Sequence, residues 1–210
     1  MPIKVILADD HALIRQSLRT LLEREGFQVM GEASDGQEAV RLAAQVRPEV
    51  AILDIAMPIL NGVDAARELG KLDGKPRAIL LTRHDEDQYV IESLRAGVRG
   101  YVLKSQAATD LVQAIRQVSR GDIYLSPGIS GAVVQAFLAK EDLPLDPLSS
   151  RERQVLQLIC EGRSTKQVAG LLGISVKTAE SHRTRLMQKL NIHETASLVR
   201  YAIRRGLVQP

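Results

Sequence analysis

Residues 4–10 read KVILADD, and this stretch decides the fold of the first part of the chain. Four apolar residues in a row, Val5 to Ala8, are followed at once by two aspartates. A short run that is apolar at every position is typical of a parallel strand covered by helices on both faces. Similar runs recur along the chain. The predicted strands are Lys4–Ala8, Gln28–Gly31, Val50–Leu53, Ala78–Thr82 and Gly100–Leu103.

Helical segments separate these strands. Apolar residues recur three or four positions apart, as at Leu18 and Leu22 after the first strand and at Ala39 and Ala43 after the second. This spacing places the apolar side chains on one face of a helix. The alternation of strands and helices predicts a doubly wound α/β fold, with a five-stranded parallel sheet, over residues 1–122.

The pattern changes after Gly121. A helix is predicted at residues 132–140, and residues 141–147 read EDLPLDP, an acidic segment that contains two prolines. Proline-punctuated polar segments are typical of connections between domains. Residues 123–147 are therefore expected to form a partly helical linker.

No strand pattern follows the linker. Capping-box patterns at Ser149–Glu152 and Ser164–Gln167 open two helices, Ser175 can cap a third, and a fourth is predicted from about Glu194 to Arg205. Residues 148–210 are expected to form a small all-α domain of four helices.

The composition is that of an ordinary globular chain, with 45% hydrophobic and 25% charged residues. Cys160 is the single cysteine, so no intrachain disulfide is expected and a reducing, cytoplasmic compartment is predicted. No signal-peptide pattern follows the first strand, and no uncharged stretch reaches the roughly 20 residues of a membrane span. Export and membrane insertion are not expected.

The net charge of +3 hides an asymmetry between the two parts. Residues 1–147 carry 17 basic and 21 acidic residues, a net charge of −4, whereas residues 148–210 carry 11 and 4, a net charge of +7. A basic end attracts nucleic acid, but small domains also carry excess charge by chance. The charge alone leaves both interpretations open.

Polar residues stand where the predicted strands end. Asp9 and Asp10 follow the first strand and Asp54 follows the third, while Thr82 ends the fourth and Lys104 follows the fifth. Each is common as a helix cap or surface charge, but ligands of open α/β sheets bind beyond the carboxyl ends of the strands. Grouped carboxylates favour a cation such as Mg²⁺. A carboxylate beside a metal, a lysine and a hydroxyl can attack a phosphoryl group.

Four segments resemble the receiver domain of two-component response regulators: VILADDH at residues 5–11, LDIAMPILNG at 53–62, ILLTRHDE at 79–86 and GYVLKS at 100–105. The resemblance covers residues 1–122 and implies a flavodoxin-like fold. It implies that Asp54 accepts a phosphoryl group from the phosphohistidine of a sensor histidine kinase. Asp10, Asp54 and the backbone carbonyl of Ala56 would bind Mg²⁺ directly, and Asp9 would act through water.

The same resemblance implies a switch. Thr82 and Lys104 would contact the phosphoryl oxygens, and Tyr101 would change rotamer together with Thr82. A partly buried core tyrosine is the alternative interpretation of Tyr101.

Some positions depart from the usual receiver pattern. Ser105 stands after the lysine, where many receivers have proline, and Arg83 and His84 follow the threonine, where small or apolar residues are more usual. His11 is expected to point to solvent from the first turn of a helix.

The basic end has the form of a helix-turn-helix. Gly173–Ser175 is a glycine-containing turn before the predicted helix Val176–Leu190. At about 100° per residue, one face of this helix carries Ala179 and Leu186, and the opposite face is polar. The polar face, with its flanks, carries Lys177, Ser181, Thr184, Gln188, Glu180 and Arg185. A solvated amphipathic helix would show the same polarity, so the alternative stays open.

Three segments of this end resemble the LuxR-type DNA-binding domain: LSSRERQVLQLICEG at residues 148–162, GISVKTAESHRTRLMQKL at 173–190 and ASLVRYAIRRGL at 196–207. The resemblance implies that Val176–Leu190 is the recognition helix and that the last helix contributes to a dimer. The candidate DNA-contacting residues are Thr165, Lys166, Lys177, Thr178, Glu180, Ser181, Arg183, Thr184, Arg185 and Lys189.

Together the two resemblances identify a NarL/FixJ-type response regulator. The expected protein is not an enzyme, and its only expected reaction is slow autodephosphorylation. It is expected to bind double-stranded promoter DNA as a homodimer and to use Mg²⁺. RNA polymerase is a further candidate partner. A DNA-binding regulator that works without phosphorylation is one alternative. A magnesium-dependent aspartyl-phosphate phosphatase is another, but it needs a second acid where Ala56 stands.

Overall fold

The computed structural model describes residues 1–83, 87–129, 147–205 and 207–208. By its internal contacts the chain divides into two compact units, Met1–Glu141 and Asp142–Pro210. The helix predicted at residues 132–140 lies outside the described residues. In the described ranges, no helix has the length and apolar character needed to cross a membrane.

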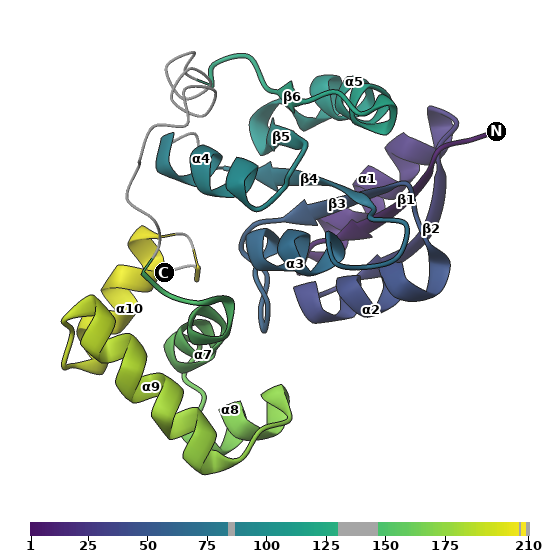
Figure 1. Cartoon of the computed structure of the whole chain (residues 1–210). Helices are drawn as coiled ribbons and strands as arrows, with labels where there is room; N and C mark the ends of the chain where they lie inside the picture. Colours follow the sequence, from purple (N-terminus) through teal and green to yellow (C-terminus); the bar gives the residue numbers. More distant parts are fainter. Residues whose placement is uncertain (84–86, 130–146, 206, 209–210) are drawn as a thin grey trace. The chain divides into compact units, whose positions relative to one another are not determined.

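A parallel sheet with strand order β2-β1-β3-β4-β5-β6 forms the centre of the first unit (Figure 1). The strands are β1 (Lys4–Ala8), β2 (Gln28–Ala33), β3 (Val50–Asp54), β4 (Arg77–Thr82), β5 (Gly100–Leu103) and β6 (Tyr124–Leu125). The five predicted strands are present. The sheet has a sixth strand, β6, which pairs with Gly100 and Tyr101 and continues the sheet past residue 122. A two-residue strand is too short to show any periodicity in the sequence.

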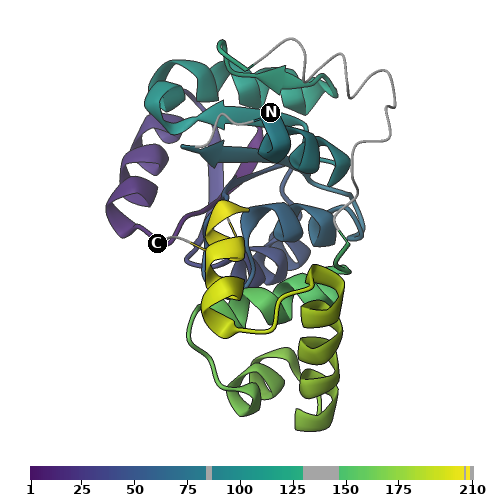
Figure 2. The ribbon, with the colours of Figure 1, turned by 90° about the vertical axis from the view of Figure 1, so that its left-hand side faces the viewer.

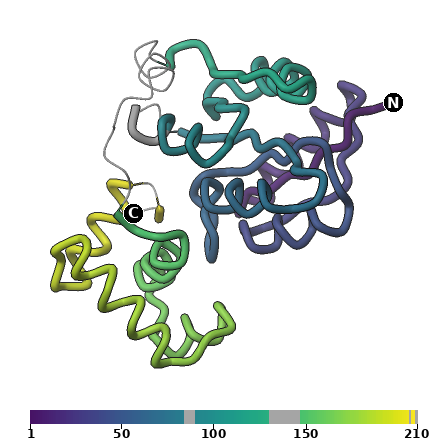
Figure 3. Tube along the Cα trace, in the orientation of Figure 1, coloured from purple at the N-terminus to yellow at the C-terminus, as the bar shows by residue number. Residues whose placement is uncertain are grey.

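Helices alternate with the strands along the chain, and the helical coils can be followed in the tube of Figure 3. They are α1 (Ala12–Arg24), α2 (Gly36–Val46), α3 (Gly62–Leu69), α4 (Asp87–Arg95) and α5 (Ala107–Arg120), with a 3₁₀ turn, η1 (Lys104–Gln106), before α5. Helices α2, α3 and α4 pack on one face of the sheet, and α1 and α5 pack on the other. The predicted doubly wound α/β fold is confirmed.

Each face of the sheet has its own apolar core. Ile52 and Leu53 are neighbours on β3, yet they belong to cores on opposite faces and are 1% and 0% exposed. Because consecutive side chains of a strand point to opposite faces, a strand covered on both sides is apolar at every position. Polar side chains are thereby displaced to the strand ends, where the candidate site lies.

In the described residues of the second unit, every regular element is a helix, coloured green to yellow in Figure 2. The helices are α7 (Ser150–Cys160), α8 (Thr165–Leu172), α9 (Val176–Leu190) and α10 (Thr195–Arg204). Both predicted capping boxes form, with Ser149 and Ser164 as the capping residues. Gly173 ends α8 with a φ of +63°, a conformation that a residue with a side chain rarely adopts. A single apolar core joins the four helices.

Candidate functional site

Three carboxylates converge at the carboxyl ends of β1 and β3. Ligand atoms of Asp9, Asp10, His11 and Asp54 all lie within 4.8 Å of one another. Asp9 and Asp54 are buried, at 1% and 3% exposed, whereas Asp10 is exposed. The fold thus brings together acidic residues that lie some 45 positions apart in the sequence.

Lys104 lies between two of these carboxylates. Its Nζ is 2.8 Å from Asp9 Oδ2 and 3.0 Å from Asp54 Oδ1. Lys104 is the first residue of η1, directly after β5, so its side chain reaches back over the end of the sheet. Three carboxylates and one ammonium group leave the cluster with a net charge of −2, with Asp10 contributing the exposed charge.

The carboxylate of Asp54 has a buried oxygen that lacks a hydrogen-bond partner among the described residues. Burial raises the pKa of this group; Lys104 opposes the shift, and Asp9 and Asp10 add to it. The buried oxygen is Oδ2. A buried carboxylate oxygen without a partner is costly, so a group that binds it is favoured. Oxygen donors with a net charge of −2 fit a hard divalent cation such as Mg²⁺.

His11 differs from its sequence-based expectation. It is the N-cap of α1, and its Nδ1 lies 2.7 Å from Asp10 Oδ1 and 3.2 Å from Asp9 Oδ1. Its side chain is 45% exposed but turned toward the carboxylates rather than to open solvent. Carboxylate oxygens of both adjacent acids lie within hydrogen-bond reach of Nδ1, and these contacts explain the difference.

Thr82 and Tyr101 lie on the same face of the sheet. Thr82 is the last residue of β4 and is 1% exposed. Tyr101 belongs to the same core as Leu80 and is adjacent to it in the β4–β5 ladder, and Thr82 lies two positions after Leu80. Residues two apart on a strand share a face. Tyr101 is fully buried, at 0% exposed, which is more than the partial burial expected of a core tyrosine.

The remaining positions lie in the surrounding loops. Ala56 is partly buried in the bend after β3, and Arg83 is exposed directly after β4. The peptide bond between Lys104 and Ser105 is trans, as are all others in the described ranges. His84 lies outside the described residues.

Arg15 supports the cluster without any signal in the sequence. Its Nη1 donates a 2.6 Å hydrogen bond to the backbone carbonyl of Asp9, and its Nε lies 3.4 Å from a carboxylate oxygen of Glu32 in β2. It therefore ties α1 to the loop that carries the acids. Arginine in a helix facing a sheet has no diagnostic spacing, so this role emerges only from the fold.

The polar face predicted for α9 is exposed in the second unit. Ala179 and Leu186 are fully buried. The exposed residues of α9 include Lys177, Glu180, Ser181, Thr184 and Arg185 on the polar face and its flanks, and Thr178 and Lys189 nearer the buried side. In the described part of the chain, Lys177 and Arg185 have no ion-pair partner, so their charges remain available to an anionic ligand.

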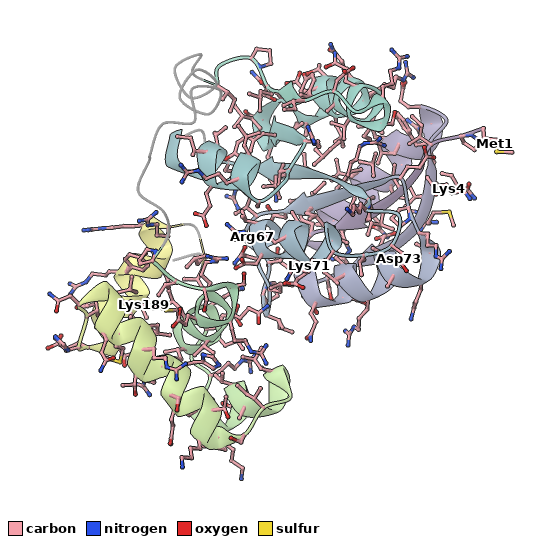
Figure 4. The ribbon with its side chains drawn as sticks, in the orientation of Figure 1. Met1, Lys4, Arg67, Lys71, Asp73 and Lys189 are labelled. Atoms are coloured by element: carbon pink, nitrogen blue, oxygen red, sulfur yellow. The ribbon has the colours of Figure 1, made fainter. Side chains whose placement is uncertain are left out.

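Two basic side chains of α9 are engaged within the unit. Lys189, labelled in Figure 4, donates a 2.7 Å hydrogen bond to Glu152 Oε2 of α7. Arg183 donates a 3.3 Å bond to the hydroxyl of Thr195 at the start of α10. These contacts hold α9 to its neighbours, a role that the sequence-based assignment to DNA did not anticipate.

The hydroxyl groups near the helix starts are also partly engaged. Thr178 shares a 2.8 Å contact with the capping hydroxyl of Ser175, and Ser181 donates to the backbone carbonyl of Lys177 at 3.0 Å. Thr165 is partly buried and Lys166 is exposed in the first turn of α8. The turn between α8 and α9 thus presents a mixed polar and basic surface.

Comparisons with known proteins match both units. Residues 5–116 match the response regulator receiver domain, and residues 146–202 match the bacterial regulatory proteins of the luxR family. The transcriptional regulatory protein MctR of Rhizobium johnstonii is 38% identical over 98% of this chain and 95% of its own length. The oxygen regulatory protein NreC of Staphylococcus carnosus is 35% identical over 98% of this chain and 99% of its own length.

A solved structure supports the same architecture. RcsB from Salmonella enterica serovar Typhimurium, bound to promoter DNA in the presence of the phosphomimetic BeF₃⁻, is 26% identical, with a TM-score of 0.64 over 96% of this chain and 98% of that one. Both domain families occur in the order expected, and the relatives are matched over nearly their full length. The chain therefore belongs to the NarL/FixJ-type two-component response regulators, which regulate transcription through a receiver domain and a LuxR-type DNA-binding domain.

Proposed function

We propose that Asp54 is the phosphoacceptor of this response regulator and that its phosphorylation by a sensor histidine kinase controls DNA binding by the second unit. The observation that carries the proposal is the unpartnered, buried Oδ2 of Asp54, held between Lys104 and the acids that follow β1. An oxygen with no hydrogen bond to give up is free to form a new bond. In this proposal the receiver is residues 1–122 and the DNA-binding domain is residues 148–210, joined by a linker at 123–147.

The transfer is a displacement at phosphorus. An oxygen of Asp54 forms a bond to the phosphorus atom, and the bond from phosphorus to the donor histidine nitrogen breaks. The electron pair of that bond stays on the nitrogen, so a neutral imidazole leaves once it holds one proton. Lys104, already 3.0 Å from Asp54, is placed to donate to the incoming phosphoryl oxygens.

Asp9, Asp10, Asp54 and the carbonyl of Ala56 are the groups proposed to hold Mg²⁺. When bound there, Mg²⁺ would neutralise the charge that develops on the phosphoryl oxygens. With the ion bound, Lys104 would still hold Asp9 and Asp54 and so would share the neutralisation of these acids. The net charge of −2 on the acids and lysine supports a divalent rather than a monovalent ion.

Thr82 and Tyr101 are the proposed switch. A phosphoryl group adds about −1.5 to −2 charge and strong acceptor oxygens, so the hydroxyl of Thr82 gains a partner at the site. Tyr101 lies on the same face of the sheet and can occupy the space that Thr82 leaves. The two changes together alter the surface formed by α4, β5 and α5 and shift the population toward the DNA-binding form.

DNA recognition is assigned to α9 with its turn. Lys177, Glu180, Ser181 and Thr184 are proposed to lie nearest the base edges, where their donors and acceptors would read sequence. Thr165, Lys166 and Arg185 would contact the phosphate backbone. Binding as a two-fold dimer predicts inverted half-sites about one helical turn apart. RcsB was solved bound to promoter DNA in the presence of the phosphomimetic BeF₃⁻, which supports a link between phosphorylation and promoter binding. The cytoplasm is the proposed location.

The test combines phosphorylation with DNA binding. Wild type, Asp54→Asn and the control Asp73→Asn, an exposed aspartate labelled in Figure 4, are incubated with Mg²⁺ and a small-molecule phosphodonor. On a phosphate-affinity gel, wild type and the Asp73 variant shift and the Asp54 variant does not. Binding to a duplex selected from a random pool then tightens on phosphorylation in wild type and Asp73→Asn, but not in Asp54→Asn. A shifted Asp54→Asn protein, or an unshifted wild type, overturns the assignment.

A further inference from the structure

A continuous series of contacts leads from the backbone of Asp54 to helix α4. Gly62, the first residue of α3, donates from its backbone N–H to the carbonyl of Ile55 at 2.8 Å. A β-carbon at position 62 would lie 2.2 Å from the carbonyl oxygen of Asp54. The start of α3 is therefore packed directly against the backbone of the proposed phosphoacceptor.

The first turn of α3 carries a buried polar pair. Asn61, the N-cap, donates from Nδ2 to Asp64 Oδ2 at 3.0 Å, and its Oδ1 accepts from the Asp64 backbone N–H at 2.9 Å. Asn61 and Asp64 are 1% and 2% exposed. A buried carboxylate of this kind needs a cation nearby, because an uncompensated buried charge is strongly destabilising.

Arg67 supplies that cation and also reaches α4. Its Nη1 donates to Asp64 Oδ1 at 2.6 Å, and its Nη2 lies 3.3 Å from Glu92 Oε1 of α4. Arg67 and Glu92 are both 20% exposed at the side chain, so the second pair is only partly screened by solvent. We call Asp64, Arg67 and Glu92 the Arg67 bridge. Arginine can serve two acids because its guanidinium presents a fork of donors.

The Arg67 bridge joins α3, which packs against the backbone of Asp54, to α4, whose surface changes in the proposed switch. Helix α3 is fixed to the Asp54 backbone through Gly62, whereas α4 follows β4, whose last residue is Thr82. In the proposed switch, phosphorylation alters the surface formed by α4, β5 and α5, while α3 stays packed against the backbone of Asp54. The Arg67–Glu92 pair, at 3.3 Å, connects α3 to a helix that belongs to this surface.

We propose that Arg67 is a positioning residue that holds α4 in the arrangement in which Lys104 binds the free carboxylates of Asp9 and Asp54, and that phosphorylation works against the Arg67–Glu92 pair. The inference rests on the proposed function of Asp54. In this proposal, the contact between Arg67 and Glu92 sets how tightly the receiver must bind a phosphoryl group before α4 changes its arrangement. By linkage, a receiver that has lost this contact binds a phosphoryl mimic more tightly, since the mimic no longer has to break it.

The chain contains a matched control pair. Lys71, just beyond α3, lies 2.7 Å from Glu68 of α3, and its side chain is 64% exposed (Figure 4). This pair has the same charges as the Arg67–Glu92 pair and begins on the same helix, but it does not reach α4. Glu68→Gln therefore removes an ion pair without removing the connection, and Glu92→Gln removes the connection with the same chemical change. Arg67→Lys keeps one positive charge for Asp64 and removes the fork.

The experiment titrates full-length wild type, Glu92→Gln, Arg67→Lys and Glu68→Gln with beryllofluoride in the presence of Mg²⁺. Occupancy is followed by NMR on the amide signals of Gly62 and Thr82, and amide hydrogen exchange of α4 is measured before the titration. In Glu92→Gln and Arg67→Lys, the beryllofluoride concentration at half-saturation falls about three- to tenfold and α4 exchange accelerates by a similar factor. Glu68→Gln matches the wild type in both.

An unchanged or higher midpoint in Glu92→Gln overturns the proposal. If α4 exchange is faster while the midpoint is unchanged, the pair has a merely structural role. An equal effect in Glu68→Gln also overturns the proposal, because the effect would then not depend on a contact with α4. If wild type does not bind beryllofluoride at all, the assignment of Asp54 falls, and this inference falls with it; binding by wild type with an unchanged midpoint in Glu92→Gln overturns the inference alone.

Discussion

The ammonium nitrogen of Lys104 lies 3.0 Å from a carboxylate oxygen of Asp54. The same nitrogen lies 2.8 Å from Asp9, so one cation is shared by two buried acids. Lys104 is therefore the counter-ion of Asp9 and Asp54 in the unphosphorylated protein. A metal ion bound at the site would lie beside this positive charge.

Removing the lysine charge tests this sharing. Lys104→Met changes the net charge of the cluster from −2 to −3, so the fold without Mg²⁺ is expected to lose about 1–3 kcal/mol of stability. Affinity for Mg²⁺ is expected to rise about tenfold, because the competing cation is gone. Thermal unfolding with and without Mg²⁺ measures both effects. Lys71→Met, on an exposed side chain, is the control and changes neither; equal behaviour of the two variants contradicts the shared role.

Gly62 permits the close approach of α3 to Asp54. A β-carbon there would lie 2.2 Å from the Asp54 carbonyl oxygen, whereas at Gly70, the C-cap of the same helix, the nearest atom is 3.5 Å away. Gly62→Ala is expected to destabilise the first unit by about 2–4 kcal/mol and to slow phosphorylation. Gly70→Ala, at a φ of −63°, is expected to be neutral or slightly stabilising. Urea unfolding compares them, and similar stabilities would refute the steric argument.

Glu152 makes the second unit sensitive to acid. Burial opposes its ionisation, but hydrogen bonds from Lys189 and Ser149 outweigh burial and lower its pKa to about 2, from 4.5. Because the folded pKa is the lower one, the stabilisation is fully present above about pH 4.5 and is lost as the pH falls toward 2. Amide exchange of α7 and α9, measured from pH 7 to pH 3, is expected to show this loss in wild type.

Two variants separate the contributions to that acid sensitivity. Glu152→Gln cannot ionise, so its stability is expected to vary less over the same pH range. Lys189→Met raises the pKa of Glu152 and costs about 1–2 kcal/mol at pH 7, a moderate value because the Lys189 side chain is 42% exposed. An identical pH profile in wild type and Glu152→Gln would rule out this carboxylate as the source.

The basic residues of α9 are expected to differ in their effect on DNA binding. Lys177→Ala and Arg185→Ala each remove an exposed charge without an ion-pair partner among the described residues, so each should weaken binding and reduce the salt slope by about one. Lys189 is already bound to Glu152, so Lys189→Ala is expected to change the slope less. Fluorescence anisotropy at several salt concentrations measures the slopes. Equal slopes in all three variants would contradict the distinction.

Several features were predictable because each leaves a local trace. The consecutive apolar positions of β3 follow from its two covered faces, and the capping boxes at Ser149 and Ser164 follow from the hydrogen bonds of helix starts. The order of Asp9, Asp54 and Lys104 at strand ends predicted that they would meet. In contrast, β6 has only two residues, and His11 turns toward carboxylates that its position in the sequence does not reveal as its partners.

The sequence by itself determined the two domain types, the strands and helices, and which polar residues gather at one end of the sheet, because periodicity and capping act over a few residues. The tertiary structure alone decided which charges pair. Lys104 meets Asp9 across 95 positions, Lys189 meets Glu152 across 37, and Arg67 meets Glu92 across 25. Such pairs depend on the packing of whole elements, and a long side chain can reach any of several partners until that packing is fixed.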